Sequence, residues 1–138
     1  SNAVPDYAKI IIDVRYKDPD DLPGITQSIQ DIAAKTYIEG TTTTVTVLNG
    51  MKPMKITDEG RQLFALVKKN SEENGFGTPS EKYVGGGSDS AYTVLAGVPT
   101  VCAMGVKGGR NHSPDEFAEV ETLFERAKLL VACVLNLD

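Results

Sequence analysis

Three consecutive glycines, residues 85–87, stand directly before a short helical pattern and constrain the fold of this chain most strongly. Glycine lets the backbone pass close to a neighbour or a ligand, and Ser88 and Asp89 are residue types that favour a helix N-cap. The helical pattern covers residues 90–96, and the apolar run 100–104 that follows is typical of a strand covered on both faces. This order predicts an α/β arrangement in which backbone amides at a helix start form an anion site.

The chain contains one histidine, His112, which follows Ser88 by 24 residues. If the strand and turn between them fold back, the histidine and the glycine turn lie at one edge of a sheet. A glycine-rich turn is usually only a turn, and a lone histidine cannot hold zinc, which takes three or four ligands. The residue pattern alone therefore leaves a metal or ligand site and a plain turn both open.

Composition excludes some classes of function. The 138 residues suit one ordinary domain, and a formal charge of −5 without a basic stripe gives no reason to expect nucleic-acid binding. No apolar run approaches the roughly 18 residues needed to span a bilayer, so we expect a soluble protein with no membrane partner. The compartment, cytoplasmic or periplasmic, stays open. Cys102 and Cys133 are expected to be small core residues.

The first half of the chain has the pattern of a strand, a helix and a strand. Residues 7–16 alternate with a period of two, which places Arg15 on the more polar face, where it is either ion-paired or available to a ligand. Ile25, Ile29, Ile32 and Ala33 mark a helical stripe with Gly40 as its stop, and residues 41–48 have the pattern of a half-buried or edge strand. The helix can cover only one sheet face, so this unit needs a partner.

The second half alternates helices with short strands. Thr57 or Asp58 caps a helix that stops at residues 74–75, and a short strand, 82–84, leads into the glycine turn. Residues 105–111 are expected to form a flexible segment that positions His112. The last helix, residues 122–137, has a wide apolar face.

Two separated motifs carry a family resemblance. Residues 85–92 (GGGSDSAY) with 97–99 (GVP), and then residues 111–116 (NHSPDE), resemble the C-terminal segment of the zinc-dependent exopeptidase and amidohydrolase superfamily. This superfamily includes glutamate carboxypeptidase, succinyl-diaminopimelate desuccinylase, acetylornithine deacetylase and aminoacylase. Residues 4–6 (VPD) and 13–16 (DVRY) resemble the lid of the same enzymes, closest to the glutamate carboxypeptidase branch.

The resemblance implies a domain plan. Residues 4–53 correspond to the second half of a ferredoxin-like lid or dimerisation domain, with β-α-β order. Residues 54–138 correspond to the C-terminal α/β segment of the catalytic domain. Residues 1–3 (SNA) have the sequence of a tag remnant.

The resemblance also implies a chemistry and its residues. In such enzymes two zinc ions, bridged by a carboxylate and a water, activate that water to attack an amide carbonyl and release an amino acid. By position, His112 is a zinc ligand, while Arg15, Gly86, Gly87 and Ser88 hold the substrate carboxylate. A planar guanidinium suits this task because it donates to two oxygens at once. The implied substrate is a small peptide or an N-acyl amino acid.

The chain departs from the family pattern because the other metal-binding residues have no counterpart in it. It contains no His-x-Asp motif, and its one Glu-Glu pair, Glu72 and Glu73, comes in the wrong order. We therefore expect a C-terminal fragment that binds zinc weakly or not at all, has no activity alone and forms a homodimer. The alternatives are a non-catalytic interaction module derived from this family and a phosphate or nucleotide binder that uses residues 85–88. The latter lacks the lysine and glycine spacing of the known phosphate loops.

Overall fold

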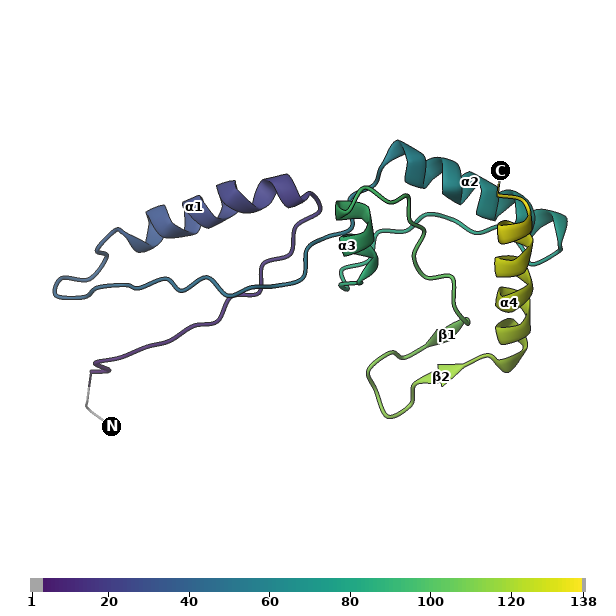
Figure 1. Cartoon of the computed structure of the whole chain (residues 1–138). Coiled ribbons are helices and arrows are strands. Elements are labelled where there is room, and N and C mark those ends of the chain that lie inside the picture. Colours follow the sequence, from purple (N-terminus) through teal and green to yellow (C-terminus); the bar gives the residue numbers. More distant parts are fainter. Residues whose placement is uncertain (1–3, 138) are drawn as a thin grey trace. The chain divides into compact units, whose positions relative to one another are not determined.

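The computed structural model describes residues 4–137, which divide into two compact units (Figure 1). The first unit ends at Thr46 and the second begins at Val47. Residues 1–3, which have the sequence of a tag remnant, lie outside the described residues. The two units are described separately.

The first unit contains the short 3-10 helix η1 (Pro19–Asp21) and the helix α1 (Leu22–Ala33). The Asp18 carboxylate accepts a hydrogen bond from the amide of Asp20 at 3.0 Å and so begins this helical segment. The helix was expected at this place, but the prediction that Gly40 stops it is wrong. The helix ends at Ala33, and Gly40, with a φ of 79°, belongs to a later turn.

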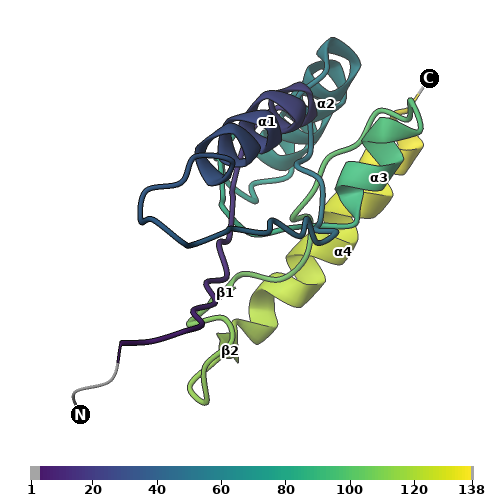
Figure 2. The ribbon, with the colours of Figure 1, turned by 90° about the vertical axis from the view of Figure 1, so that its left-hand side faces the viewer.

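The two strands expected on either side of α1 are absent from the described part of this unit. Residues 7–16 and 41–48 run as traces without strand arrows (Figures 1 and 2). Ile10, Ile11 and Ile12 are all exposed, so the alternating pattern produces no buried face. A strand forms only when a neighbouring strand completes its backbone hydrogen bonds, and alternation in the sequence does not by itself supply that neighbour. The β-α-β lid therefore remains a prediction from the resemblance.

The second unit is built on the helices α2 (Asp58–Glu73) and α4 (Val120–Leu135), both of which the sequence predicted. The Thr57 hydroxyl accepts from the amide of Gly60 at 3.0 Å and caps α2. Gly75, with a φ of 75°, follows the C-cap of α2, as its predicted stop requires.

The core of the second unit lies where α2 meets α4 near their C-terminal ends (Figure 1). Val67 of α2 packs with Leu129 and Cys133 of α4, and all three are buried. Beside them the side-chain amide of Asn136 donates to the carbonyl oxygen of the Asn70 side chain at 2.6 Å. Because Asn70 is 1% exposed, this bond satisfies a polar group that would otherwise be costly to bury.

The segment between these helices contains α3 (Ser90–Leu95), which Gly97 ends at a φ of 81° as predicted. Residues 82–84 and 100–104 are not strands, contrary to expectation. Only Val101 and Met104 of the apolar run pack against the core. Cys102 is exposed, so its prediction as a core residue is wrong, whereas the same prediction for Cys133 is confirmed.

A small antiparallel hairpin precedes α4 and was not predicted. Strand β1 (Gly108–Gly109) pairs with β2 (Phe117–Ala118), with Gly108 opposite Ala118 and Gly109 opposite Phe117. The helices and the two-stranded antiparallel sheet are compatible with the predicted α/β class. The described residues contain no parallel sheet.

Much apolar surface stays in contact with water. The accessible area is 11288 Å², whereas a compact monomer of 14.8 kDa exposes about 7,000 Å². Even two separate compact bodies of these sizes would expose only roughly 8,000 Å² together. Several apolar side chains of α4 are more than half exposed: Val120, Leu123, Phe124, Val131, Val134 and Leu135. Among the described residues, no helix is long and apolar enough to cross a membrane.

The α2–α4 contact predicts the effect of truncating Leu129, which is 1% exposed. Leu129→Ala should lower the free energy of unfolding of the second unit by about 2–4 kcal/mol, because it removes buried contacts and leaves a cavity. Leu135→Ala, at a position 78% exposed on the same helix, is the matched control and should change it by about 0.5 kcal/mol or less. Urea denaturation followed by circular dichroism measures both, and equal effects would contradict this core.

Candidate functional site

At one position of the glycine turn, an added side chain would collide with a neighbour. A Cβ built on Gly87 would lie 2.6 Å from the Met51 Sδ and 3.2 Å from its Cβ, closer than real contacts allow. A Cβ on Gly86 would meet nothing within 4 Å. The sequence predicted a close approach to the backbone here. The approaching group is the Met51 side chain, from the loop where the resemblance places the passage from lid to catalytic domain.

Ser88 organises the start of α3. Its hydroxyl accepts from the amide of Ser90 at 3.2 Å, and its carbonyl oxygen accepts from the amide of Ala91 at 3.0 Å. Asp89 occupies the N-cap position of α3, as its residue type suggested, but its side chain forms no capping hydrogen bond. The first amides of α3 are therefore already bonded within the chain, which removes them from the predicted anion site.

A thiol lies beside this turn and was missed by the sequence analysis. The Cys102 Sγ is 3.2 Å from the Ser88 Oγ. Hydrogen bonds from the Ser88 and then the Ser90 hydroxyl lower the pKa of the Cys102 thiol, against the smaller opposing effect of burial. No sequence signal could have found this pair, because it depends on the fold of residues 88–102.

The predicted metal ligand, His112, lies in the loop of the hairpin. The base of this hairpin is fixed to α4, because the amide of Lys107 donates to the Thr122 hydroxyl at 2.9 Å and the amide of Glu119 donates to the Lys107 carbonyl at 2.9 Å. Thr122 itself is 5% exposed. His112 is thus carried on an anchored element and not on the flexible segment that the sequence suggested.

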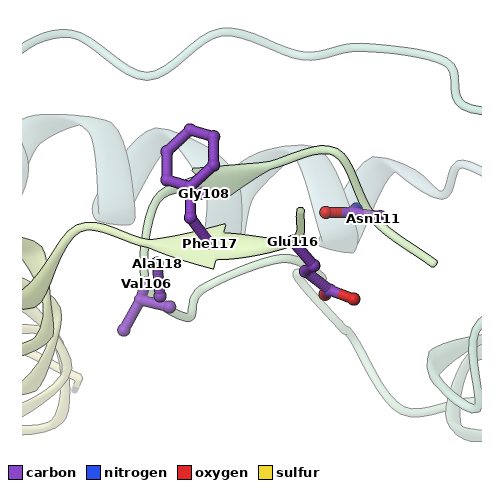
Figure 3. A pocket seen from close by; sticks show the side chains of 6 residues that line it. All are labelled: Val106, Gly108, Asn111, Glu116, Phe117 and Ala118. Carbon is purple, nitrogen blue, oxygen red and sulfur yellow. The ribbon is translucent and has the colours of Figure 1, made fainter. Parts of the chain in front are cut away.

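Glycines 108 and 109 serve the pairing of this hairpin. A Cβ on Gly108 would collide with the Phe117 carbonyl oxygen, and a Cβ on Gly109 would lie 3.0 Å from the Phe117 ring. The Phe117 ring therefore lies against Gly109. A surface pocket beside the strands is lined by Val106, Gly108, Asn111, Glu116, Phe117 and Ala118 (Figure 3).

The loop itself has an unusual backbone. Arg110 and His112 have φ values of 57° and 65°, a conformation that costs a residue with a side chain about 1–2 kcal/mol. The amide of His112 donates to the Glu116 Oε2 at 3.1 Å. The hydroxyl of Ser113 donates to the Arg110 carbonyl at 2.7 Å. Arg110 also forms a 3.8 Å ion pair with Asp115. The His112 side chain is exposed and not packed into the interior.

Arg15 belongs to the first unit. Its guanidinium forms an ion pair with Asp13 at 3.0 Å, and both side chains are largely exposed, at 67% and 72%. This is one of the two outcomes that the strand pattern left open. An exposed pair of this kind contributes little stability.

The predicted site residues of the second unit have different hydrogen-bond partners. Within the second unit, His112 bonds to Glu116, whereas Ser88 bonds to Ser90 and Cys102. Residues 4–137 contain no group of three or more His, Cys, Asp or Glu side chains that could hold a metal ion. With His112 as a single donor, the described residues do not form a complete zinc site.

The contact between Gly87 and Met51 can be tested by substitution. Gly87→Ala should displace the Met51 side chain and lower the free energy of unfolding by about 1–3 kcal/mol. Gly86→Ala is the matched control and should leave Met51 unchanged. The ¹³C methyl resonance of Met51 reports the displacement, and adding Met51→Ala to Gly87→Ala should restore the lost stability. A Met51 resonance that does not move in Gly87→Ala would refute the contact.

Comparison with known proteins agrees with the motifs. The model of peptidase family M20/M25/M40 matches residues 4–136. Carboxypeptidase G2 from Pseudomonas sp. (strain RS-16) is 25% identical over 138 residues, covering 99% of this chain and 33% of the relative. The chain therefore spans about a third of the length of this relative, and no solved structure matches. Since the family model covers nearly every residue, the chain belongs to peptidase family M20/M25/M40.

Proposed function

We propose that this chain is part of a zinc-dependent exopeptidase or amidohydrolase that releases an amino acid from a small peptide or an N-acyl amino acid. The family match over residues 4–136 carries this proposal, and the similarity to a protein named Carboxypeptidase G2 supports a parent hydrolase of the carboxypeptidase type. Zinc would polarise the scissile carbonyl and activate water in such an enzyme.

His112 is the proposed metal ligand. Its exposed side chain on an anchored hairpin supports this role, because a ligand needs an accessible imidazole on a fixed support. One donor is too few for a zinc site, and residues 4–137 contain no group of side chains that would supply the remaining ligands. No reaction step is assigned to the metal, since the described residues do not complete its site.

Arg15, Gly86, Gly87 and Ser88 are the proposed carboxylate-binding residues. The Arg15 guanidinium supports this because its partner, Asp13, is so exposed that a substrate carboxylate can replace it at small cost. Gly86 supports it because the space over its α-carbon is open. The Ser88 hydroxyl already has partners in Ser90 and Cys102, so its contribution requires an exchange of hydrogen bonds.

The chain by itself should be inactive. We expect no hydrolysis of N-acyl amino acids by the purified 138 residues, and zinc binding weaker than that of a complete site, because His112 alone cannot hold the metal. Zinc titration should shift the His112 imidazole resonances and the amide resonances of the hairpin loop in NMR spectra, and in His112→Ala these amide resonances should no longer respond. Hydrolysis that a chelator stops would contradict the predicted inactivity, and unchanged imidazole resonances would contradict the metal role.

A non-catalytic dimerisation or interaction module is the second candidate function. The surplus of exposed apolar surface, which includes Ile10, Ile11, Ile12, Val47 and Leu48, supports association with another copy. Light scattering should then give a homodimer at high concentration, and a strict monomer would refute the association. An upstream reading frame with the missing metal ligands would favour the enzyme over the module.

A further inference from the structure

We propose that Glu116 is the positioning residue for His112, because its carboxylate holds the His112 main chain in the left-handed conformation that directs the imidazole. This inference rests on the proposed metal role of His112. It assigns a task to a residue for which neither the family match nor the motif analysis gave one.

The hydrogen bond between these residues is specific to the His112 backbone. The amide of His112 donates to the Glu116 Oε2 at 3.1 Å, and among residues 4–137 this carboxylate is the one hydrogen-bond partner of His112. The other bonds of the loop serve different atoms. The Ser113 amide and hydroxyl both donate to the Arg110 carbonyl, and the Asp115 carboxylate pairs with the Arg110 guanidinium at 3.8 Å.

The φ of His112 determines where its side chain points. At a φ of 65°, the Cβ of an L-residue is crowded against its own backbone, so the residue returns to negative φ unless a contact prevents it. A change to negative φ is a rotation about the N–Cα bond of His112, and it moves the Cβ to a different position relative to strands β1 and β2. Because the strands are fixed to α4 through Thr122, the displacement would fall on the imidazole.

The hairpin register places Glu116 where it can make this bond. Gly108 pairs with Ala118 and Gly109 with Phe117, so the same register sets Glu116 opposite Arg110 at the start of the loop. Phe117 and Glu116 point to opposite sides of the strand (Figure 3). The Phe117 ring lies against Gly109, which leaves the other side of the strand to the Glu116 carboxylate.

The test compares three substitutions of Glu116 in the 138-residue chain by NMR. Glu116→Gln keeps a side-chain carbonyl oxygen at the same reach and should preserve the three-bond couplings of His112 that report its φ, such as the coupling between its amide proton and Hα. Glu116→Ala removes the acceptor, and Glu116→Asp keeps the charge but shortens the reach. Both should change these couplings and speed the exchange of the His112 amide hydrogen about tenfold. Asp115→Ala, which breaks only the ion pair with Arg110, is the matched control and should change neither.

The outcomes separate a positioning role from a merely structural one. Amide shifts of Gly109 and Phe117 report whether the hairpin base is intact in each variant. If the base is intact and the His112 couplings in Glu116→Ala and Glu116→Asp equal those of the unsubstituted chain, the proposal is overturned. If the hairpin is lost in Glu116→Ala, the test relies on Glu116→Gln. His112 couplings in Glu116→Gln that differ from those of the unsubstituted chain would then overturn the proposal. Zinc titration of the unsubstituted chain tests the metal role separately, because the couplings are measured without metal.

Discussion

The packing of α4 on α2 is the contact on which the second unit depends. It buries Leu129 and Cys133 against Val67 and pairs Asn136 with Asn70 beside them. The hairpin is attached to α4 through Thr122, so the place of His112 follows from the same contact. Among residues 4–137 only four apolar side chains are buried, Val67, Ala91, Leu129 and Cys133, which is few for this length and accounts for the large exposed apolar surface.

The helices could be predicted from the sequence because their determinants are local. Thr57 caps α2 from one residue before it, and Gly75 and Gly97 follow the helices that they end. Strands depend on partners elsewhere, and periodicity alone could not tell whether residues 7–16 or 100–104 have them. These segments have the residue pattern of strands, but in the described residues they are not part of a β-sheet.

The site shows the same division between local and distant determinants. The triple glycine was interpreted as allowing close approach of a ligand, and in the structure the group near Gly87 is the Met51 side chain, which no sequence pattern indicated. Gly108 and Gly109 were read as a source of flexibility, whereas they allow close strand pairing. The contact between Cys102 and Ser88 and the left-handed backbone of His112 could not be foreseen, because both depend on tertiary placement. The family motifs identified the protein family correctly, since they record sequence order and not contacts.

The bond between Lys107 and Thr122 has a mechanical consequence. The hairpin directly precedes the first turn of α4, and its Lys107 amide is bonded to the buried Thr122 hydroxyl of that turn. The hairpin is therefore expected to move together with the helix. A small tilt of α4 on α2 would be magnified at the far end of the hairpin, where the imidazole sits. Any contact that tilts α4 would therefore also move His112.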